Sequence, residues 1–222
     1  MPEEKLPPVE VRALGRVSYS EALDLQTALV IQRRNGAIPD QLLLLEHPHV
    51  ITVGTSSQGD HVLLSDEERT VRGIQLFEAG RGGDVTYHGP GQLVGYPILS
   101  LVPDRKDLHR YLRDLEDVLL GTLAHFGVSA AREEGFTGVW TPEGKVAAIG
   151  VRVSSGWITS HGFALNVDPD LSYFSTIVPC GIRDRGVTSM AGILRRPVSI
   201  EEVVPPLVQS FERVFARSAC VV

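Results

Sequence analysis

The spacing of apolar residues predicts two helices in the first 130 residues of the chain. Ser18 and Glu21 form a capping-box signature. Apolar residues at helical spacing follow it and end near Asn35–Gly36. The clearest helical pattern covers residues 107–126, and Gly127 stops it.

Two further helical segments are expected in the last 60 residues. Residues 171–177 predict a short helix, and a longer one is expected within residues 199–216. Pro205 and Pro206 interrupt the longer pattern, and because proline lacks a backbone N–H, we expect the helix to start or kink there.

The segments between these helices have the patterns of short β-strands. Leu42–Leu45 is a continuous apolar run, which is typical of a buried strand. Residues 138–141, 145–153 and 157–167 are separated by short turns and therefore predict a hairpin or meander. Further strands are expected at residues 9–14, 50–53, 74–78 and 92–101.

This irregular alternation of helices and hairpin-like strands predicts an α+β fold, with a mixed β-sheet and flanking helices rather than a doubly wound one. The 222 residues suit a single domain over 1–222. We expect an ordered core over about 9–215 and a frayed start at 1–8.

Composition narrows the functional classes. The 27 acidic and 21 basic residues give a net charge of −6, so a nucleic-acid partner is not expected. No apolar run approaches the ~18 residues that span a bilayer, and the start does not have the pattern of a secretory signal. Two cysteines without metal-site spacing predict a reduced, cytoplasmic protein with no metal and no cofactor. We expect a monomer.

A glycine-rich stretch from Arg81 to Leu93, RGGDVTYHGPGQL, is typical of a binding loop. Six glycines lie between Gly80 and Gly95, a density expected where backbone turns sharply or approaches a ligand. Nucleotide-binding motifs are absent, and Asp84 would repel a phosphate. A neutral or carbonyl-bearing ligand fits better.

Cys180 is a candidate nucleophile because Pro179 and Gly181 predict a tight turn around it. A thiol with a pKa near ~8.5 needs a cation, a helix N-terminus or a base before it attacks well. The alternative is a small buried hydrophobic residue. Cys220 lies in the tail and is a poor candidate.

Lys145 is one of only three lysines among the basic residues. It heads an apolar strand, where partial burial would lower its pKa and make it a partner for a thiol. The alternative is a solvated charge beside a turn. His88 and His161 could also assist a thiol, or could be structural hydrogen-bonding groups. His47 is expected to close a strand.

Four segments together resemble the lipoyl(octanoyl) transferases, in order over roughly residues 9–215. They are LLLLEHPHVITVG (42–54), RGGDVTYHGPGQLVGYPI (81–98), KVAAIGVRV with HGFALNV (145–167), and VPCGI (178–182). The resemblance implies the fold of the biotin and lipoate protein ligase catalytic domain.

The resemblance also implies an activity: transfer of octanoate from octanoyl-acyl carrier protein to a lysine of lipoyl domains, in lipoate biosynthesis. The acceptors would be lipoyl domains such as those of 2-oxo acid dehydrogenases and the glycine-cleavage H protein. Cys180 matches the cysteine that forms the acyl-thioester, and Lys145 matches its acid–base partner. The acyl-pocket segments match Arg81, Gly82, Gly83, Asp84, Val85, Thr86, Tyr87, His88, Ala148, Ile149, Gly150, Gly162, Phe163 and Ala164.

Two rival functions remain. An ATP-dependent lipoate or biotin ligase of the same fold would need ATP and would tolerate loss of the thiol. A non-catalytic module that docks lipoyl domains would need neither Lys145 nor Cys180.

Overall fold

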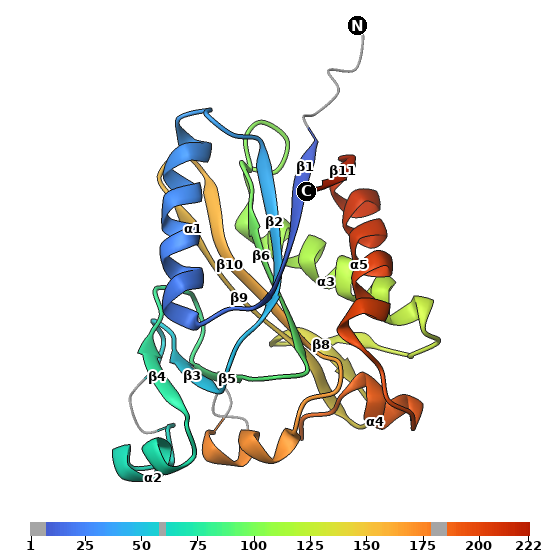
Figure 1. The fold of residues 1–222 in the computed structure, drawn as a ribbon. Coiled ribbons are helices and arrows are strands. Elements are labelled where there is room, and N and C mark those ends of the chain that lie inside the picture. The colour runs from blue at the N-terminus through green and yellow to red at the C-terminus, as the bar shows by residue number, and fades with distance from the viewer. Residues whose placement is uncertain (1–7, 58–60, 179–185) are drawn as a thin grey trace, which may run out of the picture.

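The computed structural model describes residues 8–57, 61–178 and 186–222. A mixed eight-stranded sheet runs through this part of the chain (Figure 1). Strand β1 is parallel to β2 and β11, and the remaining neighbours are antiparallel. The strand order is β11 (Ala219–Val221), β1 (Val9–Arg16), β2 (Asp40–Glu46), β6 (Gln92–Ile98), β10 (Ile158–Asn166), β9 (Gly144–Ser154), β8 (Phe136–Thr141) and β7 (Ala131–Glu133).

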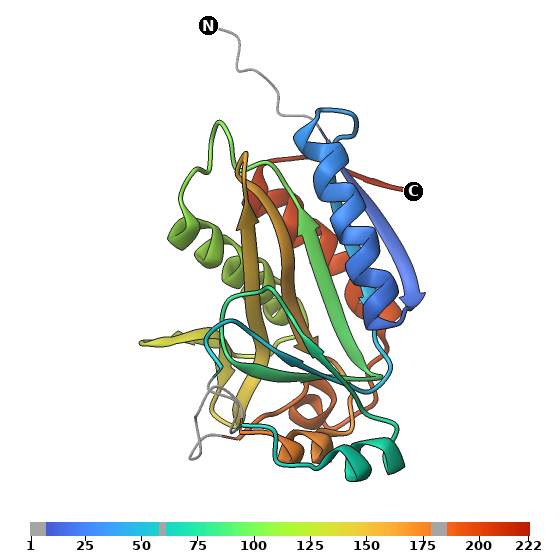
Figure 2. The ribbon, with the colours of Figure 1, turned by 90° about the vertical axis from the view of Figure 1, so that its left-hand side faces the viewer.

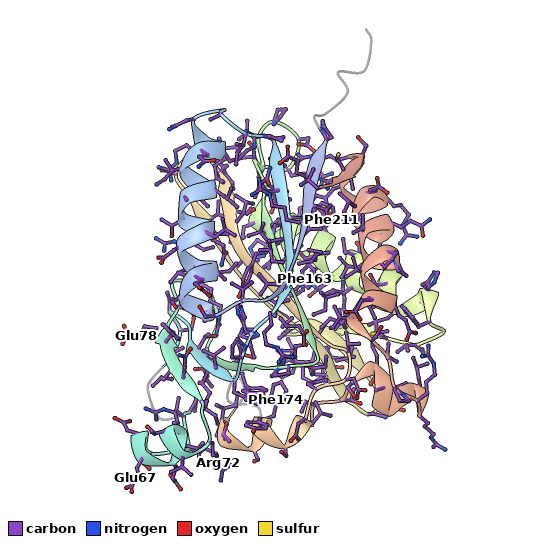
Figure 3. The ribbon with its side chains drawn as sticks, in the orientation of Figure 1. Glu67, Arg72, Glu78, Phe163, Phe174 and Phe211 are labelled. Atoms are coloured by element: carbon purple, nitrogen blue, oxygen red, sulfur yellow. The ribbon has the colours of Figure 1, made fainter. Side chains whose placement is uncertain are left out.

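Helices cover both faces of this sheet (Figures 1 and 2). Helix α1 (Tyr19–Arg34) lies on one face, and α3 (Leu108–His125) and α5 (Ile200–Phe215) lie on the other. The apolar run in β2 serves both layers: Leu42 and Leu44 pack into the core beneath α3 and α5, whereas Leu43 and Leu45 pack with α1. Figure 3 shows Phe163 and Phe211 inside the larger of these cores. The α+β fold with flanking helices is therefore as predicted.

A small second sheet crosses one end of the large one. It consists of β4 (Gln75–Glu78), β3 (Val50–Val53) and β5 (Val85–His88). Strand β5 lies inside the glycine-rich stretch, which the sequence predicts to be a loop. Three short helical segments complete the described chain: α2 (Asp66–Val71), η1 (Leu171–Thr176) and α4 (Met190–Leu194). Helix α2 is peripheral, with Glu67 and Arg72 at the edge of the molecule in Figure 3.

The predicted helix starts agree with the structure except at the two prolines. Ser18 and Glu21 form both hydrogen bonds of a capping box. Helix α5 begins at Ile200, ahead of Pro205 and Pro206, so the prolines do not start it. A capping box at Ser199 stabilises the first turn, and the buried face of the helix outweighs the lost backbone hydrogen bonds. None of the helices in the described ranges is long and apolar enough to span a membrane.

A buried ion-pair network joins the helices to the sheet away from the glycine-rich stretch. The Asp40 carboxylate, 1% exposed, accepts hydrogen bonds from Arg33 Nε at 2.6 Å, from the Ser100 N–H at 2.9 Å and from Arg217 Nη1. Removal of one partner of a buried pair leaves the opposite charge uncompensated, which costs more than the pair contributes. Asp40 therefore ties α1, β2 and the chain after α5 together.

We expect Asp40→Ala to lower the free energy of unfolding by about 3–5 kcal/mol, because Arg33 and Arg217 lose their shared acceptor. Urea denaturation measures this change. Asp66→Ala is the matched control, since Asp66 pairs with Arg69 at 2.5 Å but its side chain is 97% exposed. Its expected effect is about 1 kcal/mol or less. Equal losses in the two variants would contradict this assignment.

Candidate active site

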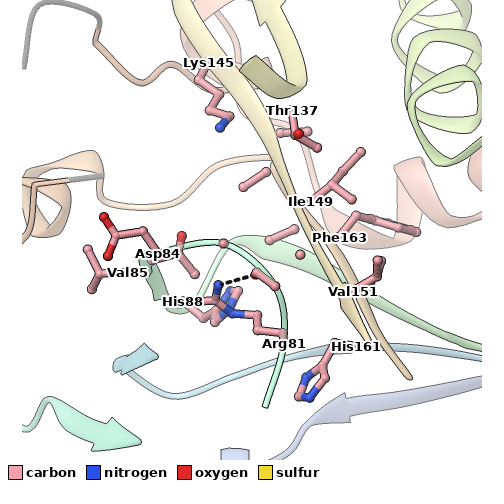
Figure 4. A pocket seen from close by; sticks show the side chains of 18 of the residues that line it. Arg81, Asp84, Val85, His88, Thr137, Lys145, Ile149, Val151, His161 and Phe163 are labelled. Carbon is pink, nitrogen blue, oxygen red and sulfur yellow. Dashed lines mark hydrogen bonds between the residues drawn. The ribbon is translucent and has the colours of Figure 1, made fainter. Parts of the chain in front are cut away.

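One cavity of about 590 Å³ gathers the residues that the sequence singles out. It is lined by Arg81 to His88, by Lys145, by Ala148 to Gly150 and by His161 to Ala164. Figure 4 shows Lys145 at one end of the cavity and Arg81, His88 and His161 at the other. Cys180 lies outside the described residues.

Small residues on β9 and β10 make room for the cavity. In the antiparallel register Ala148 faces Ala164, and Gly150 faces Gly162. A Cβ atom on Gly150 would lie 3.0 Å from Arg81 Cδ, and one on Gly162 would overlap the Gly95 carbonyl oxygen. Larger side chains at either glycine would therefore push the Arg81 segment or strand β6 away from the floor of the cavity.

A β-bulge brings Lys145 to this cavity. The β8–β9 register shifts from Val139↔Ala147 to Trp140↔Lys145, so Val146 is the extra residue on β9. Val146 and Ala147 are both buried in the core beneath α3 and α5, whereas regular alternation would point them to opposite faces. The bulge thereby places Lys145 on the same face as Ala148 and Gly150.

The Lys145 side chain is fixed by its neighbours on β8. Its Nζ lies 5.0 Å from the centre of the Trp140 ring, a cation–π distance. Gly138 has a φ of +118°, and a Cβ there would come within 2.7 Å of Lys145 Cε. The Gly138 N–H donates to Glu116 Oε1 at 3.2 Å, and Glu116 is fully buried on α3. Trp140, Gly138 and Glu116 thus set where the ammonium group lies.

The described residues on either side of Cys180 are hydrogen-bonded to different parts of the structure around the cavity. On one side, the Val178 N–H donates to the His61 carbonyl at 2.9 Å, and the His61 ring in turn hydrogen-bonds the Asp84 carboxylate. On the other side, the Lys145 N–H donates to the Gly186 carbonyl at 3.0 Å. Val178 therefore lies next to His61, the partner of Asp84, and Gly186 lies next to Lys145.

Arg81 is buried, and its guanidinium is held by hydrogen bonds to β3 of the small sheet. It is 7% exposed, and its Nη2 donates to the Thr52 carbonyl at 2.7 Å and to Thr52 Oγ1 at 2.8 Å. A guanidinium stays charged, so Arg81 is a fixed positive charge against the cavity. It opposes protonation of His88 and His161, whose pKa values are lowered mainly by burial and further by Arg81.

A cluster of aromatic rings lies at the far end of the cavity, here called the ring cluster. Tyr19, His88, Tyr96 and His161 line the cavity, and His47 packs behind them. Neighbouring ring centres are 5.4–6.2 Å apart. His161 has a φ of +54°, rare for a residue with a side chain. This turn brings its ring against Tyr96, and its N–H is satisfied by Gln26 Oε1 of α1 at 2.7 Å.

His47 does not line the cavity, and its hydrogen bonds fix its tautomer. Nδ1 lies 2.7 Å from the Val17 carbonyl, which can only accept, so Nδ1 carries the proton. Nε2 therefore accepts from the Tyr96 hydroxyl at 2.8 Å. His47 follows β2 directly, as expected of a residue that closes a strand.

Several lining residues were not predicted from the sequence. Tyr19 and Tyr96 come from α1 and β6, far apart along the chain. Tyr96 lies in the 81–98 segment, but nothing in the local sequence of either tyrosine marks it as a site residue. Leu108, Leu112 and Phe136 also line the cavity, and Leu108 and Phe136 are partly exposed. Only the fold brings these side chains to the site.

The buried histidines predict a loss of stability in acid. Burial lowers the pKa of His47 and of His161 to about 4, below the ordinary value of 6.5. The unfolded chain therefore binds protons first, and stability falls as the pH drops from about 6.5 towards 4. For His47 alone the expected loss is on the order of 3 kcal/mol.

Urea denaturation between pH 7 and pH 4 measures this loss. His47→Gln should reduce the dependence of the unfolding free energy on pH over that window, because one buried proton-binding group is removed. His125→Gln is the matched control, since His125 is exposed at the end of α3. An unchanged pH dependence in His47→Gln would contradict the assignment.

Comparison with known proteins identifies the family. Residues 18–212 match the family model of the lipoyl protein ligase A/B catalytic domain. The chain therefore belongs to the lipoyl protein ligase A/B catalytic domain family.

Curated relatives identify the branch of the family to which the chain is similar. The chain is 51% identical over 215 residues to an octanoyltransferase of Rubrobacter xylanophilus, covering 96% of each chain. It is 50% identical over 205 residues to an octanoyltransferase of Solibacter usitatus, covering 92% of each. Within the family, the chain stands with the octanoyltransferases.

Solved structures share the fold at low sequence identity. A lipoate-protein ligase A bound with ATP has a TM-score of 0.72 at 17% identity, covering 98% of this chain and 89% of that one. A biotin protein ligase from Aquifex aeolicus has a TM-score of 0.54 at 12% identity, covering 95% and 70%. These neighbours bear out the predicted fold of the biotin and lipoate protein ligase catalytic domain.

Proposed function

We propose that this chain transfers octanoyl through a thioester on Cys180, with Lys145 as its acid–base partner and octanoyl-acyl carrier protein as the donor. The coarser statement follows from family membership: the chain is an acyltransferase of lipoate biosynthesis. The acceptors that we propose are lysines of lipoyl domains. The observation that carries the proposal is the bulge that brings Lys145 to the cavity, beside the chain that continues from Cys180.

The proposed reaction has two balanced steps. In the first, Lys145 takes the Cys180 proton, the thiolate attacks the octanoyl thioester, and the carrier thiol leaves with a proton. In the second, the acceptor amine attacks the acyl-enzyme, which forms an amide and returns the thiol to Cys180. The first step exchanges one thioester for another, so no ATP is needed. This sequence predicts ping-pong kinetics.

The surroundings of Lys145 suit both proton transfers. A lysine can release and regain a proton, whereas arginine stays protonated. The Trp140 ring, 5.0 Å from Lys145 Nζ, limits where the side-chain nitrogen can lie. The Lys145 main chain is held on both sides of the residue, because its N–H donates to Gly186 and its carbonyl accepts from Thr188, each at 3.0 Å.

Intact mass after incubation with octanoyl-acyl carrier protein, without ATP, tests the covalent step. We expect one added octanoyl group that hydroxylamine removes, because it is held as a thioester. Cys180→Ala should stay unmodified, whereas Cys220→Ala, which removes an exposed cysteine, should be acylated like the wild type. An unmodified wild type would overturn the covalent mechanism, and a strict need for ATP would favour the ligase.

Lys145→Arg tests the acid–base role. It keeps the positive charge but cannot exchange a proton, so we expect transfer to fall by roughly 100-fold or more. The measurement is the rate of octanoyl transfer to a purified lipoyl domain. Lys106→Arg, at an exposed lysine over the Trp157 ring, is the matched control and should retain wild-type activity. Near-normal activity in Lys145→Arg would contradict the acid–base role and would mean that Lys145 acts through its positive charge alone.

A further inference from the structure

The strand that pairs with β9 ends before it reaches Lys145. The β9–β10 ladder stops at Ala147, and β8 occupies the other side of β9. Beyond Ala147, residues 186–188 take the place of β10. The Lys145 N–H donates to the Gly186 carbonyl and the Thr188 N–H donates to the Lys145 carbonyl, each at 3.0 Å, in the pattern of a parallel bridge. The 186–188 segment therefore continues the sheet beside Lys145.

Asn166 reaches this segment from the end of β10. It is the last residue of the strand, is 5% exposed and lines the cavity. Its Nδ2 donates to the Thr188 carbonyl at 3.0 Å. A carbonyl oxygen can only accept a hydrogen bond, so the nitrogen of the amide must be the atom that faces it. Asn166 thus supplies from its side chain a link to the segment where the β10 backbone no longer pairs with β9.

Asn166 is itself held in place by the glycine-rich stretch. Its backbone pairs with Gln92 of β6. The two residues that follow it, Val167 and Asp168, both donate their N–H groups to the Gly91 carbonyl, at 3.1 and 3.0 Å. A Cβ atom on Gly91 would overlap the Asp168 carbonyl, which shows how closely the two backbones approach. The Asn166 amide therefore extends from a fixed part of the sheet.

The 186–188 segment forms part of the cavity wall next to Lys145. Val187 lines the cavity together with Lys145. A shift of the Thr188 backbone would move both Val187 and the bridge to Lys145. Position matters at this point, because a displacement of about 1 Å from productive geometry can slow an enzyme by about 100-fold.

The fold itself does not depend on Asn166. The Ala191 N–H donates to the Val167 carbonyl at 2.9 Å, which joins the start of α4 to the end of β10 independently. Loss of the Asn166 amide leaves this attachment in place. We therefore expect it to displace the 186–188 segment locally and not to unfold the chain.

We infer that Asn166 is a positioning residue for acyl transfer, an inference that rests on the proposed function. By holding the Thr188 carbonyl, it keeps the 186–188 segment paired with Lys145 and so sets where Lys145 lies against the cavity. Asn166 takes no proton and forms no bond to the acyl group, so the two steps of the reaction are unchanged. The alternative is a buried hydrogen bond that contributes to stability alone.

Two variants remove the donor in different ways. Asn166→Leu has a similar volume and no charge, whereas Asn166→Asp keeps the shape but has a carboxylate that cannot donate. Gln41→Leu is the matched control, because Gln41 is fully buried and its Nε2 donates to Glu10 and to the Pro39 carbonyl, outside the cavity lining. Urea denaturation establishes that all three variants fold. An effect shared by the Asn166 variants and absent from Gln41→Leu reports the lost donor.

Single-turnover acylation over a range of octanoyl-acyl carrier protein concentrations, followed by intact mass, gives the maximum rate and the half-saturating concentration. We expect the Asn166 variants to lower the maximum rate by roughly 10-fold or more, because Lys145 is displaced. The half-saturating concentration should stay within about 3-fold of the wild type, since the amide does not bind the donor. Gln41→Leu should keep both values.

Alkylation by iodoacetamide reports the placement of Lys145 without an acyl donor. In a Cys220→Ala background, Cys180 is the one cysteine of the chain. The thiolate is the form that reacts, and a nearby lysine favours it. We therefore expect the alkylation rate to rise at higher pH in both Asn166 variants than in the parent. Gln41→Leu should keep the pH profile of the parent.

The two measurements separate the possible failures. Wild-type acylation rates in both Asn166 variants would overturn the inference alone. Slower acylation with an unchanged alkylation profile would also overturn it, because Lys145 would not have moved. A wild type that is not acylated would overturn the proposed function, and the alkylation profiles would then decide whether Asn166 positions Lys145.

Discussion

The pairing of β9 with β10 across small residues is the constraint on which the site depends. A slip of one residue would send every side chain of the pair to the opposite face. In the observed register, Ala148 faces Ala164 and Gly150 faces Gly162. The Arg81 segment can then approach the sheet closely at Gly150. The floor of the cavity and the wall opposite it therefore follow from one alignment of two strands.

Two departures from regular strand geometry then place polar side chains at the floor of the cavity. The bulge at Val146 turns Lys145 to the cavity face, and the positive φ of His161 turns its ring against Tyr96. Conformations like that of His161 cost on the order of 1–3 kcal/mol. Such residues persist only where their surroundings hold them, and here the Gln26 side chain satisfies the His161 N–H.

Much of the fold is visible in the sequence because it depends on local chemistry. The capping box at Ser18 marks a helix start, and the apolar run at Leu42–Leu45 marks a strand buried by helices on both faces. Pro205 and Pro206 do not start α5, because burial of the helix outweighs their local penalty. Strand β5 was missed because its partner β3 lies more than thirty residues away.

The site was only partly predictable for the same reason. Its glycine-rich segment and Lys145 stand out as local patterns. The bulge at Val146 depends on how β8 aligns with β9. Only the fold brings the Tyr19 ring against His47, and His47 against His88. Alternation along β9 alone would have assigned Lys145 to the same face as Ala147. That error would have placed it in the core.

The attachment of Lys145 to Gly186 has a mechanical consequence. The main chain of Lys145 accepts and donates hydrogen bonds to the segment that continues from Cys180, so any displacement of β9 at this point carries that segment with it. Thermal motion of Lys145 and of the Gly186–Thr188 backbone is then correlated, and the separation of these two segments varies less than the position of either one. Two backbone hydrogen bonds, rather than a rigid surrounding domain, provide this coupling.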